Sequence, residues 1–150
     1  MPEEQVPPVV AVVVANDPGR WFEDCLEALG AQDYPNLDVL VVDAASHDEL
    51  TARVAAVLPR AFILRQREDN GFSAAANEAL FAVEGASHLL ICHDDVAPAP
   101  DAVRCMVGES YRSNAGIVGP KLVEWDAPDR LLQVGLAVDR LLDRFPENAR

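Results

Sequence analysis

Four apolar runs with the composition of strands recur along this chain, and a segment with helical periodicity separates each run from the next. The first run, Val9–Ala15, is continuous and rich in β-branched residues, which is typical of a strand buried on both faces. Such alternation predicts an α/β fold with a mainly parallel sheet, helices on both faces and right-handed crossovers. The further predicted strands are Leu37–Val42, Ala61–Gln66, Ser87–Cys92 and a short fifth one at Gly116–Gly119.

Helix signals and composition divide the chain into regions. Ser46 and Glu49 fit a capping box, so we expect a helix to begin at Ser46 and to stop at Pro59. Residues 1–8 read as a disordered leader, and residues 9–123 form the predicted α/β domain. The region 124–150 is less regular, with a candidate edge strand at Leu131–Val138 and a tail from Phe145.

The charge of the chain excludes some classes of partner. With 150 residues and a net charge of −13, the protein lacks the clustered Lys and Arg that neutralise phosphates in nucleic-acid binders. The acidic N-terminus has no basic signal region, and no apolar run is long enough to span a bilayer. Three cysteines without a CxxC spacing indicate structural thiols in a reducing cytosol. We therefore expect a cytoplasmic domain that binds no nucleic acid.

Polar side chains follow three of the predicted strands directly. Asn16 comes after the first strand, Asp43 after the second, and Asp94 with Asp95 after the fourth. Ligands of parallel sheets bind beyond the carboxyl ends of the strands, and Mg²⁺ and Mn²⁺ prefer oxygen ligands. The alternative is that these acids cap turns or helices and are solvated. His93, directly before the acidic pair, could be a ligand or a structural residue.

A glycine loop opens the third predicted helix, which runs from Ala74 to about Val83. The loop contains Asn70 and Gly71, and small alanine side chains follow it. Free backbone N–H groups at such a helix start favour a phosphate, although an ordinary helix entry gives the same pattern. Asn77 lies one turn into the helix and could face the same crevice or the surface.

Taken together, these segments resemble family 2 glycosyltransferases, which have the GT-A fold. The run Val9–Asn16 with the later turn Gln32-Asp33-Tyr34-Pro35 is similar to the opening strand and turn of the family. Val39–Asp48, Asn70–Asn77 and Leu89–Val96 resemble its next three motifs, in the same order. The chain departs from the family pattern at His93, which takes the first place of the Asp-x-Asp motif, and in a shortened loop at Asn70-Gly71.

The resemblance implies a Rossmann-like, nucleotide-sugar-binding half of a GT-A enzyme over residues 9–123, followed by the start of an acceptor half. It implies an inverting, metal-dependent transfer from a nucleotide-diphosphate sugar to a saccharide or lipid-linked acceptor, as in cell-envelope polysaccharide synthesis at the cytoplasmic face of the membrane. Asp43 would contact the base, Asp94 the ribose or sugar, and Asp95 a Mn²⁺ or Mg²⁺ ion, with His93 as a further candidate ligand. The implied donor-binding residues are Ala15, Asn16, Asp43, Asn70, Gly71, Asn77 and Asp94.

One part of the expected machinery has no match in this sequence. An inverting transferase needs a general base, and the acids Glu124, Asp126 and Asp129 do not match the motif that supplies it in the family. Membrane association would come only through regions beyond this chain. The alternative function is therefore a non-catalytic nucleotide-sugar-binding or interaction module of the same fold. A receiver domain would need an acid after the third strand, and a Rossmann oxidoreductase would need a GxGxxG motif after the first.

Overall fold

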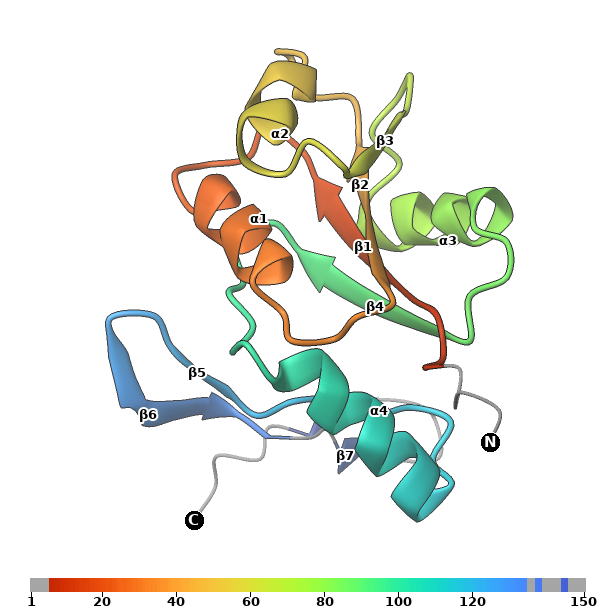
Figure 1. Ribbon diagram of the computed structural model, residues 1–150. Coiled ribbons are helices and arrows are strands. Elements are labelled where there is room, and N and C mark those ends of the chain that lie inside the picture. The colour runs from red at the N-terminus through yellow and green to blue at the C-terminus, as the bar shows by residue number, and fades with distance from the viewer. Residues whose placement is uncertain (1–5, 135–136, 139–143, 146–150) are drawn as a thin grey trace. The chain divides into compact units, whose positions relative to one another are not determined.

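The computed structural model describes residues 6–134, 137–138 and 144–145, and the chain divides into two compact units, residues 1–104 and 105–150. The first unit holds a four-stranded sheet of β1 (Val9–Ala15), β2 (Leu37–Asp43), β3 (Phe62–Arg65) and β4 (His88–His93). The strand order is β3-β2-β1-β4 and every pairing is parallel (Figure 1). The predicted α/β fold with a mainly parallel sheet is confirmed.

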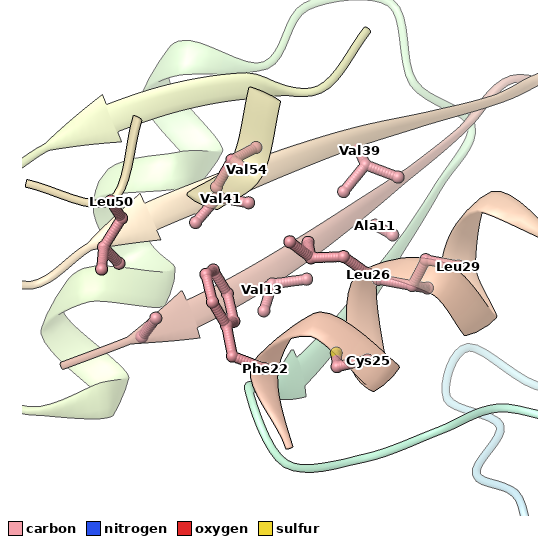
Figure 2. Packing of buried hydrophobic residues seen from close by; sticks show 11 residues of the cluster. Ala11, Val13, Phe22, Cys25, Leu26, Leu29, Val39, Val41, Leu50 and Val54 are labelled. Atoms are coloured by element: carbon pink, nitrogen blue, oxygen red, sulfur yellow. The ribbon is translucent and has the colours of Figure 1, made fainter. Parts of the chain in front are cut away.

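Helices cover both faces of this sheet, as predicted. Alternate residues of a strand point to opposite faces, so Val13 and Val41 face α1 (Phe22–Gly30) and α2 (Thr51–Val57). The neighbouring residues of these strands face α3 (Phe72–Ala82) (Figure 1). Figure 2 shows the larger of the two clusters, in which Phe22, Leu26, Leu29, Leu50 and Val54 pack on Ala11, Val13, Val39 and Val41.

The structure corrects one of the predicted helix starts. The second helix begins at Thr51 rather than Ser46, and its preceding residue, Leu50, makes no side-chain cap. Ser46 is held elsewhere, because its Oγ accepts a hydrogen bond of 2.9 Å from the N–H of Asp17. The capping-box prediction is therefore wrong, since a contact across 29 residues replaces the local one.

Two strand predictions beyond residue 105 are also wrong. α4 (Ala102–Ser113) is followed by β5 (Leu122–Glu124) and β6 (Ala127–Gln133), which pair antiparallel with each other outside the parallel sheet. Residues 116–119 form no strand, because glycines flank only two apolar residues and Ile117 is 94 % exposed. The predicted strand Leu131–Val138 is divided between β6 and a short pair, β7 (Ala137–Val138) with β8 (Arg144–Phe145).

Hydrogen bonds anchor the segment that leads into β1. The carbonyl of Val6 accepts from Asn36 Nδ2 at 2.7 Å, and that of Pro7 accepts from the Tyr34 hydroxyl at 2.7 Å. Residues 6 and 7 of the predicted leader are therefore held in place, whereas residues 1–5 and the end of the predicted tail, 146–150, lie outside the described residues. None of the helices in the described ranges is long and apolar enough to cross a membrane.

Candidate functional site at the carboxyl ends of the strands

The carboxyl ends of β1, β2 and β3 are tied together by short hydrogen bonds. The N–H of Ala44 donates to the carbonyl of Ala15 at 2.8 Å, and Asn16 Nδ2 donates to the carbonyl of Ala44 at 2.6 Å. The N–H of Gln66 donates to the carbonyl of Asp43 at 2.8 Å. Of the predicted donor-binding residues, the structure thus brings together Ala15, Asn16 and Asp43.

Asp43 lies at the centre of this edge with a carboxylate that is only 1 % exposed. Its Oδ1 accepts a hydrogen bond of 2.9 Å from the N–H of Ser46. Its Oδ2 has no hydrogen-bond partner, and the nearest cation, Nη1 of Arg65, is 3.6 Å away. Arg65 also donates from Nη2 to the carbonyl of Ser46 at 3.0 Å. One oxygen of Asp43 therefore holds the local turn, and the other remains able to accept a hydrogen bond.

A cavity of about 390 Å³ is lined by Ala45, Ser46, Arg65, Gln66 and Arg67, which follow β2 or lie at the end of β3. Gln66 is only 8 % exposed, and neither its Oε1 nor its Nε2 has a hydrogen-bond partner. Arg65 and Gln66 were not predicted as site residues from the sequence. The signal was present, because both stand at the carboxyl end of a predicted strand, where Asp43 was identified by the same reasoning.

Asp17 and His47 form a pair beyond the same strand ends. His47 Nδ1 lies 2.6 Å from Asp17 Oδ2, and the N–H of His47 donates to Asp17 Oδ1 at 2.7 Å. These hydrogen bonds lower the pKa of the Asp17 carboxyl and raise the pKa of the His47 imidazole. Asp17 has a positive φ of 45°, a conformation that Asp adopts more readily than most residues. The pair connects the loops that follow β1 and β2.

The acidic motif lies at the end of β4, next to the start of α3. The ring of His93 stacks on Phe72 with 4.0 Å between centroids. Asp94 is half-buried, and burial, together with the charge of Asp95, raises the pKa of its carboxyl. Asp95 is exposed. A divalent cation would offset both effects on Asp94, so the two carboxylates suit a metal that also takes water or phosphate oxygens.

The protein alone does not enclose a cation here. Among the described residues, no group of three or more His, Cys, Asp or Glu side chains is placed to hold a metal ion. Mg²⁺ and Mn²⁺ are commonly bound through one or two carboxylates with a substrate diphosphate completing the shell. The donor set of Asp94 and Asp95 fits that manner of binding. His93 packs against Phe72, and its part in metal binding stays a prediction.

The start of α3 has a backbone that suits close approach of a ligand. Gly71 has a φ of +85°, and its N–H donates to Oδ1 of Asp69 at 2.8 Å. The stack between Phe72 and His93 brings this helix start to the end of β4. Asn70 and Asn77 are exposed, and no contact described for them joins them to Asp43 or Asp94. Their role in donor binding stays a prediction.

Comparison with known proteins identifies the family and the fold of this chain. The model of the glycosyl transferase family 2 matches residues 9–144. The mannosyltransferase PcManGT from Pyrobaculum calidifontis, solved in complex with GDP-Man and Mn²⁺, is 28 % identical, with a TM-score of 0.66 over 79 % of this chain and 36 % of its own. S. aureus TarS 1–349, solved in complex with UDP-GlcNAc, shares the fold, with 18 % identity and a TM-score of 0.62 over 76 % of this chain and 37 % of its own.

This chain thus spans well under half of the length of these solved structures. No curated protein matches it in sequence. The family match covers most of the chain and includes every strand of the parallel sheet and the acidic motif. The protein is therefore a member of glycosyl transferase family 2.

Proposed function

We propose that this chain is the donor-binding part of an inverting, metal-dependent glycosyltransferase. It would bind a nucleotide-diphosphate sugar whose glycosyl group passes to an acceptor hydroxyl. The observation that carries the proposal is the placement of acidic side chains at the carboxyl ends of the strands in a chain of glycosyl transferase family 2. A buried carboxylate with an unpartnered oxygen follows β2, and a half-buried acidic pair follows β4.

In this proposal, the base and the sugar of the donor lie at the carboxyl ends of different strands. Asp43 accepts a hydrogen bond from the base, and Asp94 contacts the ribose or the sugar. The N–H groups at the start of α3 face the diphosphate, because free helical N–H groups favour anions. The remaining donor contacts come from Ala15, Asn16, Asn70, Gly71 and Asn77.

Asp95 would hold Mn²⁺ or Mg²⁺ with help from Asp94, and His93 is a further candidate ligand. When bound, such an ion supplies positive charge next to the leaving diphosphate, where negative charge develops during transfer. The complex of PcManGT with GDP-Man and Mn²⁺ supports this part of the proposal. The chain's own carboxylates would orient the ion and the sugar.

The acceptor is proposed to be a saccharide or a lipid-linked saccharide, as in cell-envelope polysaccharide synthesis on the cytoplasmic side of a membrane. The general base is not assigned to a residue of this chain. Glu124 is a poor candidate, because its Oε2 is paired with Nη1 of Arg130 at 3.1 Å. The second candidate function is a non-catalytic module of the same fold that binds nucleotide sugars.

Calorimetric titration of the full chain with GDP, UDP and dTDP, each with and without Mn²⁺, tests the proposal. We expect one of them to bind, and Mn²⁺ to strengthen its binding about ten-fold or more, because each ten-fold step corresponds to about 1.4 kcal/mol, the strength of one charge-assisted contact. Asp95→Asn should remove this dependence on Mn²⁺. Asp38→Asn removes the same charge from the exposed start of β2 and should not.

An unchanged dependence on Mn²⁺ in Asp95→Asn would show that the metal is bound elsewhere. Hydrolysis of the donor sugar separates the two candidate functions. Slow release of free sugar from a bound donor, dependent on Mn²⁺, indicates a transferase site. Binding without any release indicates the non-catalytic module.

A further inference from the structure

The side chain of Gln32 connects the end of α1 to the segment that follows the acidic motif. Its Nε2 donates to the carbonyl of Ala28 in α1 at 3.0 Å, and to those of Pro98 at 3.3 Å and Ala99 at 2.8 Å. Its Oε1 accepts a hydrogen bond of 3.0 Å from the N–H of Val103. Since both ends of the amide are engaged, its orientation is fixed, and with it the path of residues 98–103.

The bond to Val103 also serves the start of α4. The first N–H groups of a helix have no partner within the helix, and Oε1 of Gln32 supplies one for this residue. The backbone of the next residue adds a contact, because the N–H of Asp33 donates to the carbonyl of Pro100 at 2.8 Å. The turn after α1 therefore holds the segment 98–103 through several hydrogen bonds, all of them to backbone groups.

The chain on the other side of the acidic pair is held as well. His93 pairs with Val14 in the parallel sheet, and its carbonyl accepts from Sγ of Cys25 at 3.8 Å. The side chain of Val96 packs against the core cluster between the sheet and α1. Asp94 and Asp95 thus lie on a short bridge whose two ends are fixed by α1 and by the turn that follows it.

Such a bridge matters for a cation that has strict geometry. Mg²⁺ takes oxygen ligands at about 2.0–2.1 Å in near-ideal octahedral arrangement, so a small shift of a carboxylate weakens its binding. Groups that orient the ligands of a metal without touching it typically contribute about 10–100-fold to its affinity. The hydrogen bonds of Gln32 act at that level, because they fix the chain directly after the two carboxylates.

We propose that Gln32 is a positioning residue for the acidic motif, and that its amide keeps Asp94 and Asp95 in the place that a divalent cation requires. This inference rests on the proposed function, since it assumes that the acidic pair binds Mn²⁺ or Mg²⁺. Gln32 itself would touch neither the metal nor the donor. Its effect would pass through the carbonyls of Pro98 and Ala99 and the start of α4.

The variant Gln32→Met tests the inference, because it keeps the length of the side chain and removes both polar atoms. Affinities of the full chain for GDP, UDP and dTDP are measured by calorimetry, each with and without Mn²⁺. For a nucleotide that binds, we expect the gain in affinity from Mn²⁺ to fall from about ten-fold or more to about three-fold or less. The affinity without Mn²⁺ should stay close to that of the unaltered protein, which a general loss of structure would not allow.

Tyr34→Phe is the matched control from the same turn. It removes the hydrogen bond of 2.7 Å from the Tyr34 hydroxyl to the carbonyl of Pro7, which precedes β1 at the amino end of the sheet. Tyr34 is only 8 % exposed, so this variant also loses a bond of a largely buried side chain. We expect it to keep the gain in affinity from Mn²⁺ that the unaltered protein shows.

A second variant, Gln32→Glu, keeps an acceptor for the N–H of Val103 and loses the donors to Pro98 and Ala99. It should lower the gain from Mn²⁺ as well, and circular dichroism shows whether each variant is folded.

Three results would overturn the inference and leave the proposed function standing. They are an unchanged gain from Mn²⁺ in a folded Gln32 variant, an equal fall of that gain in Tyr34→Phe, and failure of both Gln32 variants to fold, which would mean that Gln32 serves the fold alone. If the unaltered chain binds none of the nucleotides, or gains nothing from Mn²⁺, the proposed metal site and the inference are both wrong.

Discussion

Removing the Asp43 side chain should separate its structural role from its role in binding. Asp43→Ala takes away Oδ1, the acceptor for the N–H of Ser46, and Ser46 is only 3 % exposed. A buried N–H left unpaired costs about 1–3 kcal/mol. The lost pairing with Arg65 adds little, because that side chain can be solvated. We therefore expect Asp43→Ala to lower the free energy of unfolding by about 1–3 kcal/mol.

Asp43→Asn should behave differently, because its side-chain carbonyl can still accept from Ser46. We expect it to lower the free energy of unfolding by less than about 1 kcal/mol, while both variants lose binding of the nucleotide. Urea unfolding monitored by circular dichroism measures the difference, which corresponds to a midpoint shift of about 1 M at a typical m-value. Asp38→Ala on the exposed start of β2 is the control and should stay within about 0.5 kcal/mol of the unaltered protein.

Equal stability of Asp43→Ala and Asp43→Asn would refute this reasoning. It would mean that the hydrogen bond from the N–H of Ser46 to Oδ1 of Asp43 makes no net contribution to the free energy of unfolding. Retained nucleotide binding in Asp43→Asn would instead show that the base does not depend on the charge of this carboxylate.

Two further predictions concern the neighbouring loops. Gly71→Ala should lower the free energy of unfolding by about 1–2 kcal/mol, because Gly71 has a φ of +85°. Gly108→Ala inside α4 meets open space and should raise the free energy of unfolding by about 0.5–1 kcal/mol. Thermal unfolding of the two variants measures this contrast. NMR titration should give His47 a pKa above its ordinary value, and Asp17→Asn should return it toward that value. Since the pKa of His47 is raised, the pairing of His47 with Asp17 stabilises the folded protein below about pH 6.5. This stabilisation is lost as the pH rises through the pKa of His47 in the folded protein. An ordinary pKa for His47 in this titration would mean that the ring does not pair with Asp17 in solution.

The parallel sheet could be predicted from the sequence because its signal is local. Apolar runs such as Val9–Ala15 can be buried only between two layers of helices, and the residues that follow them must reach one common edge. Asp43 and the pair Asp94-Asp95 were predicted as candidate site residues for this reason. The strand expected at 116–119 failed because two apolar residues between glycines bury too little surface.

The rest of the site depends on contacts between residues far apart in the chain. Ser46 looked like a helix cap, but the N–H of Asp17 reaches its Oγ once β1 and β2 are paired. No local pattern encodes that contact. Gln66 looked like the end of a strand, and only the folded chain shows that its amide is buried without a partner.

The strand order also sets the distance between the two parts of the candidate site. β3 and β4 are the two edges of the sheet, and β2 and β1 lie between them. Neighbouring strands are about 4.8 Å apart, so the step from β2 or β3 to β4 measures about 10–14 Å. A molecule that touches Gln66 and the acidic motif together must be extended and must reach across the ends of several strands. A free base or a lone diphosphate could occupy one end of this span but could not bridge it. The spacing of the strands would therefore favour long ligands over short ones.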